Sequence, residues 1–217
     1  MTNRLMQCLL PLAAAVVLVA QASTTTASDA AEGRAEPRRI LLDTDPGGDD
    51  VLALLWLQSL AKQGCAEIVA VTTVAGNVHS EHTFANAGKI LALGGFGHVE
   101  VGRSATVRRR AEDAAHIHGA DGMGNLSQTL PAPQRRLDRA RYAHHIIIEK
   151  LSAAPGEITL VAIGPLTNLA AAEEKSPGIL AKAKEVVIMG GAFRGGKRGH
   201  QAEKGDITDI NGCGRER

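Results

Sequence analysis

The segment LLDTDPGGDD, residues 41–50, places four aspartates directly behind an apolar run: Asp43, Asp45, Asp49 and Asp50. Like charges repel, so crowded carboxylates are costly unless a cation or a polyhydroxylated ligand lies among them. Calcium is the natural counter-ion, because it prefers oxygen ligands and tolerates irregular geometry. In the alternative interpretation, Asp49 or Asp50 caps a helix and Asp43 is solvated. The size of the cluster favours a ligand site.

These aspartates need a framework, and the pattern along the chain predicts one. Short apolar and β-branched runs predict strands, and longer segments predict helices. The strands are expected at 39–43, 66–74, 99–103, 157–163 and 184–191, and the helices at 50–64, 80–95, 139–154 and 165–175. Continuous apolar strands that alternate with helices are typical of an α/β fold with a doubly wound, mostly parallel sheet.

The acidic segment lies where the first predicted strand ends. Pro46 and Gly47 predict a turn there, and Asp49 and Asp50 then open a helix, whose N-terminal dipole favours anions. Ligands of such sheets bind beyond the carboxyl ends of the strands. We therefore expect the carboxylates to line a ligand crevice and not the core. Residues 104–134, a polar stretch with glycines, are too long for an ordinary connection and predict a functional or disordered loop.

The composition limits the classes of partner. The chain has 217 residues with 24 Lys and Arg against 23 Asp and Glu, which gives a net charge of +1. This balance gives no electrostatic reason to expect nucleic acid or an anionic membrane surface as a partner. Aromatic residues make up only 2% of the chain, so a base-stacking platform is unsupported.

The N-terminus has the pattern of an export signal. Arg4 precedes the apolar run CLLPLAAAVVLVA, and small residues follow it. We expect a signal peptide at 1–28, a linker at 29–38 and one domain at 39–217. The apolar run is short for a transmembrane helix, so the mature protein is expected in the periplasm or outside the cell, without membrane attachment. The cysteines that remain, Cys65 and Cys213, form no disulfide framework and no zinc pattern.

Five segments occur in an order that is typical of one enzyme family: DTDPGGDD (43–50), TTVAGNV (72–78), HIHGADGMGN (116–125), ITLVAIGPLTNLA (158–170) and EVVIMGGAF (185–193). Together they resemble the inosine-uridine preferring nucleoside hydrolases, which are calcium enzymes that cleave the N-glycosidic bond of ribonucleosides. The resemblance covers about residues 38–195. It implies the Rossmann-like α/β fold of that family.

The resemblance also implies a metal site and a base. Asp45 would be both a calcium ligand and the general base that takes a proton from the attacking water. Asp50 would be a second carboxylate ligand, and Ile163 would offer its backbone carbonyl to the ion. Asp43 would support the turn from behind these ligands.

Four further residues would contact the nucleoside. Asp49 and Asn77 would hold ribose hydroxyl groups, and Met189 would lie against the sugar. His118 would belong to a mobile loop that closes over the substrate. From the residues alone, Asn77 could also be a turn residue, His118 a surface residue and Met189 a core residue.

The implied partner is a small nucleoside, which would be cleaved to a purine or pyrimidine base and ribose. The transition state resembles an oxocarbenium ion, and a crevice lined by anions stabilises its positive charge. The sequence does not distinguish purine from pyrimidine preference. It leaves the oligomeric state open, a homo-oligomer included.

The C-terminal region departs from the family pattern. The family continues into Gly-Asn-x-Thr and Ala-Glu-Phe-Asn, whereas this chain has GDITDINGCG at 205–214, with Asp206 in place of the asparagine. A histidine and an aspartate that the family draws from a later segment have no counterpart. We therefore expect a C-terminally truncated member of impaired activity. The alternatives are a secreted ribose- or nucleoside-binding module and an inactive remnant.

A second enzyme class also begins with a similar pattern. Asp43-Thr44-Asp45 after an apolar strand resembles the start of the haloacid-dehalogenase phosphatases, which would use magnesium. That family would have Thr or Val two places after the second aspartate, where this chain has Gly47. A phosphatase therefore remains an alternative with weaker support.

Overall fold

The computed structural model describes residues 36–104 and 113–190, which contain a five-stranded sheet. Its strands are β1 (Arg38–Thr44), β2 (Ala66–Thr73), β3 (Val101–Gly102), β4 (Ile158–Ala162) and β5 (Glu185–Ile188). They lie in the order β3-β2-β1-β4-β5, and every neighbouring pair is parallel. The expected α/β fold with a parallel sheet is confirmed.

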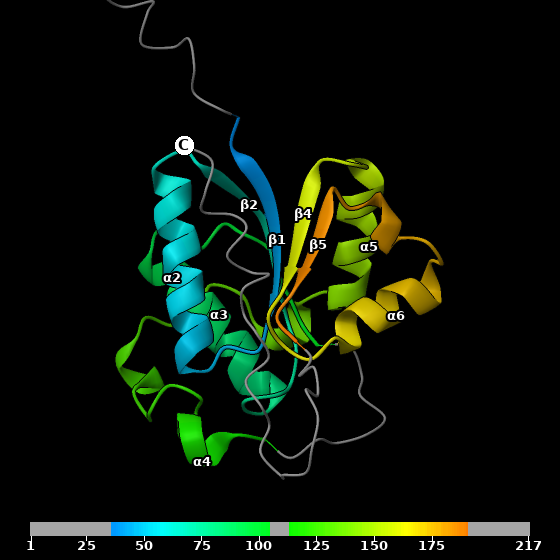
Figure 1. The fold of residues 1–217 in the computed structure, drawn as a ribbon. Coiled ribbons are helices and arrows are strands. Elements are labelled where there is room, and N and C mark those ends of the chain that lie inside the picture. Colours follow the sequence, from blue (N-terminus) through cyan, green and yellow to red (C-terminus); the bar gives the residue numbers. More distant parts are fainter. Residues whose placement is uncertain (1–35, 105–112, 191–217) are drawn as a thin grey trace, which may run out of the picture. The chain divides into compact units, whose positions relative to one another are not determined.

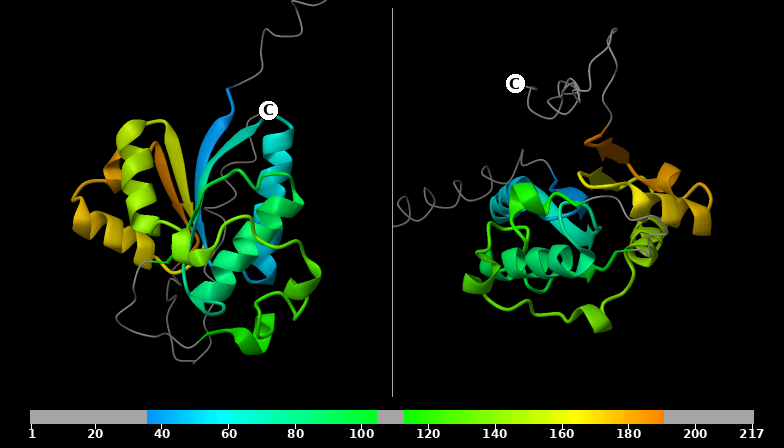
Figure 2. Two further views of the ribbon diagram at one scale, coloured as in Figure 1. Left: turned by 180° about the vertical axis from the view of Figure 1, so that it is seen from behind. Right: turned by 90° about the horizontal axis from the view of Figure 1, so that it is seen from below.

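Helices cover both faces of this sheet (Figures 1 and 2). On one face lie α2 (Gly48–Lys62) and α3 (Ser80–Leu93), and on the other lie α5 (Ala143–Ala153) and α6 (Thr167–Lys175). Because successive side chains of a strand point to opposite faces, Leu41 packs with the α5 and α6 core and Leu42 with the α2 and α3 core. Each layer thus has its own buried apolar cluster, and the sheet is doubly wound.

The long polar stretch after β3 contains short elements of its own. The helix α4 (Ala115–His118) and the 3₁₀ turn η1 (Ser127–Thr129) lie at the end of the sheet where α2 begins (Figure 1). Two more 3₁₀ turns follow, η2 (Leu137–Arg139) and η3 (Leu180–Lys182). The helix predicted from residue 139 therefore begins four residues later, at Ala143, because η2 and a bridge between Arg103 and Tyr142 come first.

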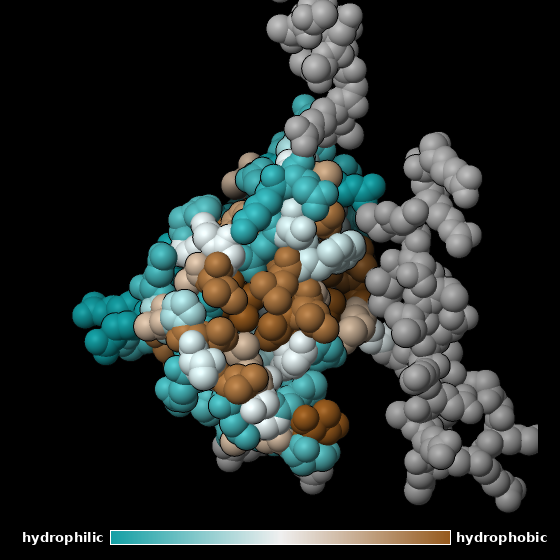
Figure 3. Space-filling model, turned by 90° about the vertical axis from the view of Figure 1, so that its left-hand side faces the viewer, coloured by the Kyte–Doolittle hydropathy of each residue, from teal (hydrophilic) through white to brown (hydrophobic). Residues whose placement is uncertain are grey.

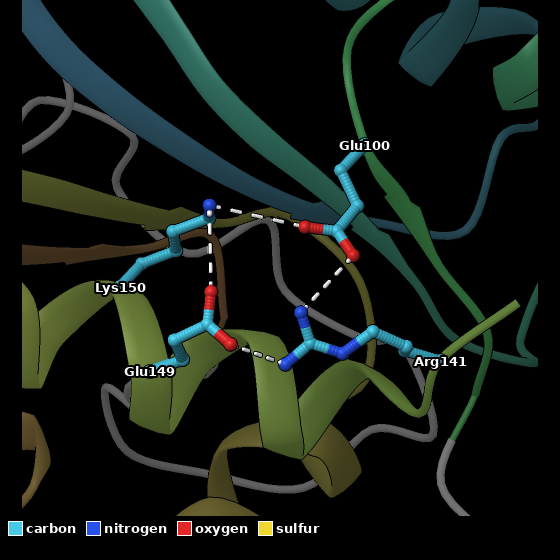
Figure 4. Close-up of polar contacts among 4 residues, drawn as sticks. All are labelled: Glu100, Arg141, Glu149 and Lys150. Atoms are coloured by element: carbon cyan, nitrogen blue, oxygen red, sulfur yellow. Dashed lines mark hydrogen bonds and ion pairs between the residues drawn. The ribbon is translucent and has the colours of Figure 1, made fainter.

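Four charged side chains join the start of β3 to α5 (Figure 4). Arg141 contacts Glu100 at 3.3 Å and Glu149 at 2.6 Å, and Lys150 contacts the same two carboxylates at 3.9 and 3.7 Å. The hydrogen bond from Arg141 lowers the pKa of Glu149. These side chains are all partly solvent-exposed, so the pairs contribute little to stability and mainly fix how α5 enters the fold.

The outer face of α2 is apolar and exposed. Leu52 and Trp56 are each 67% exposed and Leu55 is 38% exposed, and hydrophobic residues gather on the side of the molecule that carries α2 (Figure 3). None of the helices within 36–104 and 113–190 is long and apolar enough to cross a membrane.

Some of the sequence predictions fall outside the described residues. They are the signal peptide, the linker up to residue 35 and the C-terminal segment from residue 191, which includes Asp206. The described part of the predicted domain runs from β1 to Gly190, with a gap at 105–112.

Candidate active site

The predicted site residues follow the carboxyl ends of the parallel strands. Asp45 follows β1, Asn77 comes four residues after β2, Ile163 follows β4 and Met189 follows β5. The order β3-β2-β1-β4-β5 means that the chain winds outward in both directions from the β1–β4 pair. In parallel sheets the ligand crevice lies at such a switch point. Asp45 and Ile163 flank it.

Asp45 is held in a narrow slot. Its side chain is only 5% exposed, and its Oδ2 accepts a hydrogen bond of 2.8 Å from the backbone N–H of Asn77. Glycines flank the carboxylate on both sides: a Cβ on Gly164 would lie 2.5 Å from Asp45 Oδ1, and one on Gly76 would overlap Oδ2. Any larger residue at either glycine would displace the carboxylate. Gly76 of the motif GNV and Gly164 of the motif IGP thus leave the space that the Asp45 carboxylate occupies.

Asn77 connects Asp45 to Asp50. Its Nδ2 donates to the Asp45 carbonyl at 3.0 Å and to Asp50 Oδ2 at 2.9 Å. Asp50 is 3% exposed, in the first turn of α2, and its Oδ1 accepts a 2.6 Å hydrogen bond from Thr44 Oγ1. The structure therefore brings Asp45, Asp50 and Asn77 together, as the sequence predicts. Asn77 lies in the loop after β2, and from there its side chain also bridges Asp45 and Asp50.

Burial and mutual repulsion perturb these carboxylates. Burial, and after it the negative charge of Asp50, raise the pKa of Asp45 to about 7 against the effect of the Asn77 hydrogen bond. Burial also raises the pKa of Asp50, although the Thr44 hydroxyl stabilises its charged form. A carboxyl group whose pKa lies near neutral pH can accept a proton in the reaction and release it afterwards.

Asp43 differs from the crevice position that we expected. It is fully buried, and its Oδ1 accepts hydrogen bonds from Thr72 Oγ1 at 2.5 Å and Asn168 Nδ2 at 2.8 Å. Burial raises its pKa to about 7, against the effect of these two donors, and its Oδ2 has no hydrogen-bond partner. The expectation that all four carboxylates line the crevice is thus wrong for Asp43. Pairing of β1 with β2 and β4 places it in the interior, where its carboxylate contacts Thr72 and Asn168.

The reasoning from sequence missed Asn168. This fully buried side chain, in the first turns of α6, also donates to the Thr73 carbonyl at 2.9 Å, and so ties α6 to β1 and β2. Its only sequence signal is a polar residue on the apolar face of PLTNLAAA. Thr72 is the second missed partner of Asp43, and it pairs with Asp43 in the register of the two strands.

The other predicted substrate residues lie at different distances from this centre. Asp49 is exposed in the first turn of α2, and its charge raises the pKa of both Asp45 and Asp50. His118 lies over the same turn, where its Nδ1 accepts a 3.2 Å hydrogen bond from Gly48 N–H. Met189 is 46% exposed beyond β5, and its backbone N–H donates a 2.8 Å hydrogen bond to the Ala162 carbonyl. Met189 is therefore not a core residue, and it lies two strands from Asp45.

The donor set suits a hard cation. Asp45 and Asp50 offer carboxylate oxygens and Ile163 a backbone carbonyl, which are the ligand types that calcium prefers. Burial raises the pKa of both aspartates, and a cation beside them would stabilise their charged forms. Within the described residues, no group of three or more His, Cys, Asp or Glu side chains could hold a metal ion. The residues fit calcium, but with only two carboxylates.

Comparisons with known proteins show which family the chain resembles. The family model described as inosine-uridine preferring nucleoside hydrolase matches residues 40–211. An inosine-uridine preferring nucleoside hydrolase of Leishmania major is 39% identical over 170 residues, which are 77% of this chain and 52% of that protein. Uridine nucleosidase 1 of Arabidopsis thaliana is 36% identical over 158 residues, which are 71% of this chain and 45% of that protein. A solved plant nucleoside hydrolase superposes with a TM-score of 0.63 at 37% identity, over 72% of this chain and 49% of that one.

Two consequences follow from these comparisons. The chain spans about half the length of the curated relatives that it matches. The phosphatase alternative loses its support, since the matched family is a different one and the fully buried Asp43 has no access to a substrate.

Proposed function

The chain belongs to the inosine-uridine preferring nucleoside hydrolase family, and from this premise we propose that it hydrolyses the N-glycosidic bond of ribonucleosides with Asp45 as the general base. The observation that carries the proposal is the setting of Asp45. Its carboxylate lies in a glycine-walled slot at the switch point of the sheet, beside Asp50, and burial raises its pKa to about 7.

The reaction needs a proton acceptor beside the attacking water. In the proposed step, Asp45 takes a proton from water while the water oxygen bonds to the anomeric carbon of ribose. The bond from that carbon to the base nitrogen breaks, and the electron pair leaves with the base. The negative charges of Asp45, Asp49 and Asp50 favour the positive charge that develops on the sugar.

Calcium is the proposed cofactor. Asp45, Asp50 and the carbonyl of Ile163 would hold it, and when bound it would supply positive charge that orients and polarises the attacking water. With two carboxylates among the donors, we expect weak affinity, on the order of 10⁻³ M, because calcium affinity falls with each lost charged ligand.

The substrate is proposed to contact the residues around this centre. Asn77, whose Nδ2 donates to the Asp45 carbonyl and to Asp50, is proposed to contact a ribose hydroxyl. Asp49, which is exposed on the first turn of α2, is free to accept from a second hydroxyl. His118 would lie on the solvent side of the sugar, and Met189 would contact it from the end of β5.

Calorimetry and a ribose-release assay on the same protein test this proposal. We expect ribose, inosine and uridine to bind when calcium is present, and Asp45→Ala to remove both the binding heat and any release of ribose. The control is Asp138→Ala, which removes an exposed carboxylate that pairs with Arg136 and leaves the site intact. Absence of binding heat for all three ligands in millimolar calcium would overturn the proposal.

A second candidate function is a ribose- or nucleoside-binding module without turnover. It is favoured by the donor set among the described residues, since Asp45 and Asp50 meet through Asn77 without a third acidic, His or Cys side chain grouped with them. The same experiment separates the two functions. Binding heat without ribose release over hours would support the module, and calcium-dependent release would support the hydrolase.

A further inference from the structure

The loop that carries His118 is tightly folded around one carboxylate. Asp121 accepts hydrogen bonds from the backbone N–H groups of Met123, Asn125 and Ser127, each at 2.8 Å. Burial raises the pKa of Asp121, but these three donors outweigh it and hold the pKa below its usual range. The Asp121 carboxylate therefore organises the segment from His118 to Ser127 into one compact unit.

One buried side chain joins this unit to the acidic turn. Asn86, on α3, is fully buried, and its Nδ2 donates to the Pro46 carbonyl at 3.2 Å and to the Asp121 carbonyl at 2.8 Å. Its Oδ1 accepts a 3.2 Å hydrogen bond from Ser127 Oγ. The Asn86 amide thus bonds with both its nitrogen and its oxygen. It joins Pro46 to Asp121, which lies 75 residues later in the sequence.

The neighbouring positions support the same contact. Lys89, one turn further along α3, donates to the Ser127 carbonyl at 2.6 Å and to Ser127 Oγ at 2.8 Å. Gly122 has a φ of +81°, and a Cβ there would lie 3.0 Å from Asn86 Nδ2 and 3.1 Å from the Pro46 carbonyl. Glycine at 122 is therefore needed for the loop to approach the acidic turn this closely.

The contact determines where His118 lies. Gly48 N–H donates to His118 Nδ1, and a Cβ on Gly47 would lie 2.9 Å from that same nitrogen and 2.6 Å from Asn77 Nδ2. His118 and Asn77 thus both contact the turn whose Pro46 carbonyl accepts a hydrogen bond from Asn86. The side chain of Asn86 itself is buried and cannot reach a ligand in the crevice.

We propose that Asn86 is a positioning residue, which ties the His118–Ser127 segment to the Pro46 turn and thereby holds His118 against the start of α2 beside Asp45 and Asn77. This inference rests on the proposed function for its importance to catalysis, but the tie itself can be tested without a substrate.

Hydrogen–deuterium exchange of the backbone amides tests the tie. In Asn86→Ala, we expect the amides of Met123, Asn125 and Ser127, and also the amide of Gly48, to exchange about tenfold faster or more. The variant removes the donor of the Pro46 and Asp121 carbonyls, and a buried polar group left without its partner shifts a local opening equilibrium by about this factor. The Gly48 amide is the informative one, because it lies 38 residues before position 86 and its hydrogen-bond partner among the described residues is His118.

Gln58 provides a matched control. It is a second buried side-chain amide, 2% exposed, and its Nε2 donates to the carbonyls of Leu54 and Ile90 at 3.3 Å, so it also joins α2 to α3. Gln58→Ala should lower the melting temperature by a similar amount but leave exchange at Gly48 and in the loop unchanged. Faster exchange at these amides in both variants would mean that Asn86 acts only through global stability, and would overturn the proposal.

A second variant keeps the proposal testable if Asn86→Ala does not fold. Gly122→Ala changes only the loop side of the contact. It should speed hydrogen–deuterium exchange at the Gly48 and Ser127 amides, as Asn86→Ala does. Unchanged exchange of the Gly48 amide in either folded variant would show that the tie does not position His118. None of these readouts uses nucleoside or calcium. Absence of nucleoside binding would therefore refute the proposed function and leave the tie standing.

Discussion

Replacing Asp43 by asparagine separates the charge of this buried carboxyl from its hydrogen bonds. The new amide keeps an oxygen to accept from Thr72 and Asn168, but it cannot ionise. In the wild type, burial raises the pKa of Asp43 from 3.8 to about 7. The folded protein therefore binds this proton more tightly than the unfolded chain. The stability that results is fully present below about pH 4 and is lost as the pH rises through about 7.

The size of the effect follows from that shift. The difference of about 3 pKa units corresponds to about 4 kcal/mol, at about 1.4 kcal/mol per unit. We expect the unfolding free energy of the wild type, relative to Asp43→Asn, to fall by up to about 4 kcal/mol between pH 4 and pH 8. Asp45 titrates in both proteins, so its contribution cancels in the difference.

Urea unfolding followed by circular dichroism, with EDTA present at a series of pH values, measures this difference. Asp138→Asn serves as the control, because its carboxylate is exposed beside Arg136, and its difference from the wild type should not vary with pH. A pH-independent difference for Asp43→Asn would show that Asp43 does not titrate in this range. A variant that grows less stable than the wild type as the pH rises would show that Asp43 is charged and stabilising.

Two further predictions concern the metal and the slot. Millimolar calcium should raise the melting temperature of the wild type, and the double variant Asp45→Ala, Asp50→Ala should show no such shift; an equal shift in both would remove the proposed calcium site. Gly164→Ala should cost about 1–3 kcal/mol and abolish the calcium shift, because its Cβ would lie 2.5 Å from Asp45 Oδ1. Gly190→Ala is the matched control, since its Cβ would meet Ile188 at 3.4 Å, and a calcium shift that survives Gly164→Ala would contradict the role of the slot.

The sequence predicted the framework because its signals are local. Apolar runs such as 39–43 and the turn at Pro46 and Gly47 are read within a few residues, and they placed Asp45 directly after β1 and Asp50 in the first turn of α2. The spacing of the later motifs could not show which residues meet. Asn77 contacts both aspartates only because β2 lies directly beside β1.

The buried polar partners could not be predicted, because they depend on long-range packing. Asn168 lies 125 residues from Asp43 and meets it only after α6 packs on the sheet. The acidic run at a strand end placed Asp43 at the crevice, whereas the family resemblance implied a supporting position behind the ligands. Its position within the register of β1, between two paired strands, decides its burial. Asn86 gave no signal either, because one asparagine within a helix is compatible with many roles.

The central claim is that Asp45 acts as the base of a nucleoside hydrolase, and a chimeric enzyme tests it most directly. Residues 39–190 would replace their counterparts in the Leishmania major relative, whose matched part is 52% of its length. We predict calcium-dependent ribose release from inosine or uridine, and a loss of at least about 10²-fold in Asp45→Asn at an unchanged melting temperature. Undiminished ribose release by a folded Asp45→Asn chimera would contradict the assignment of Asp45.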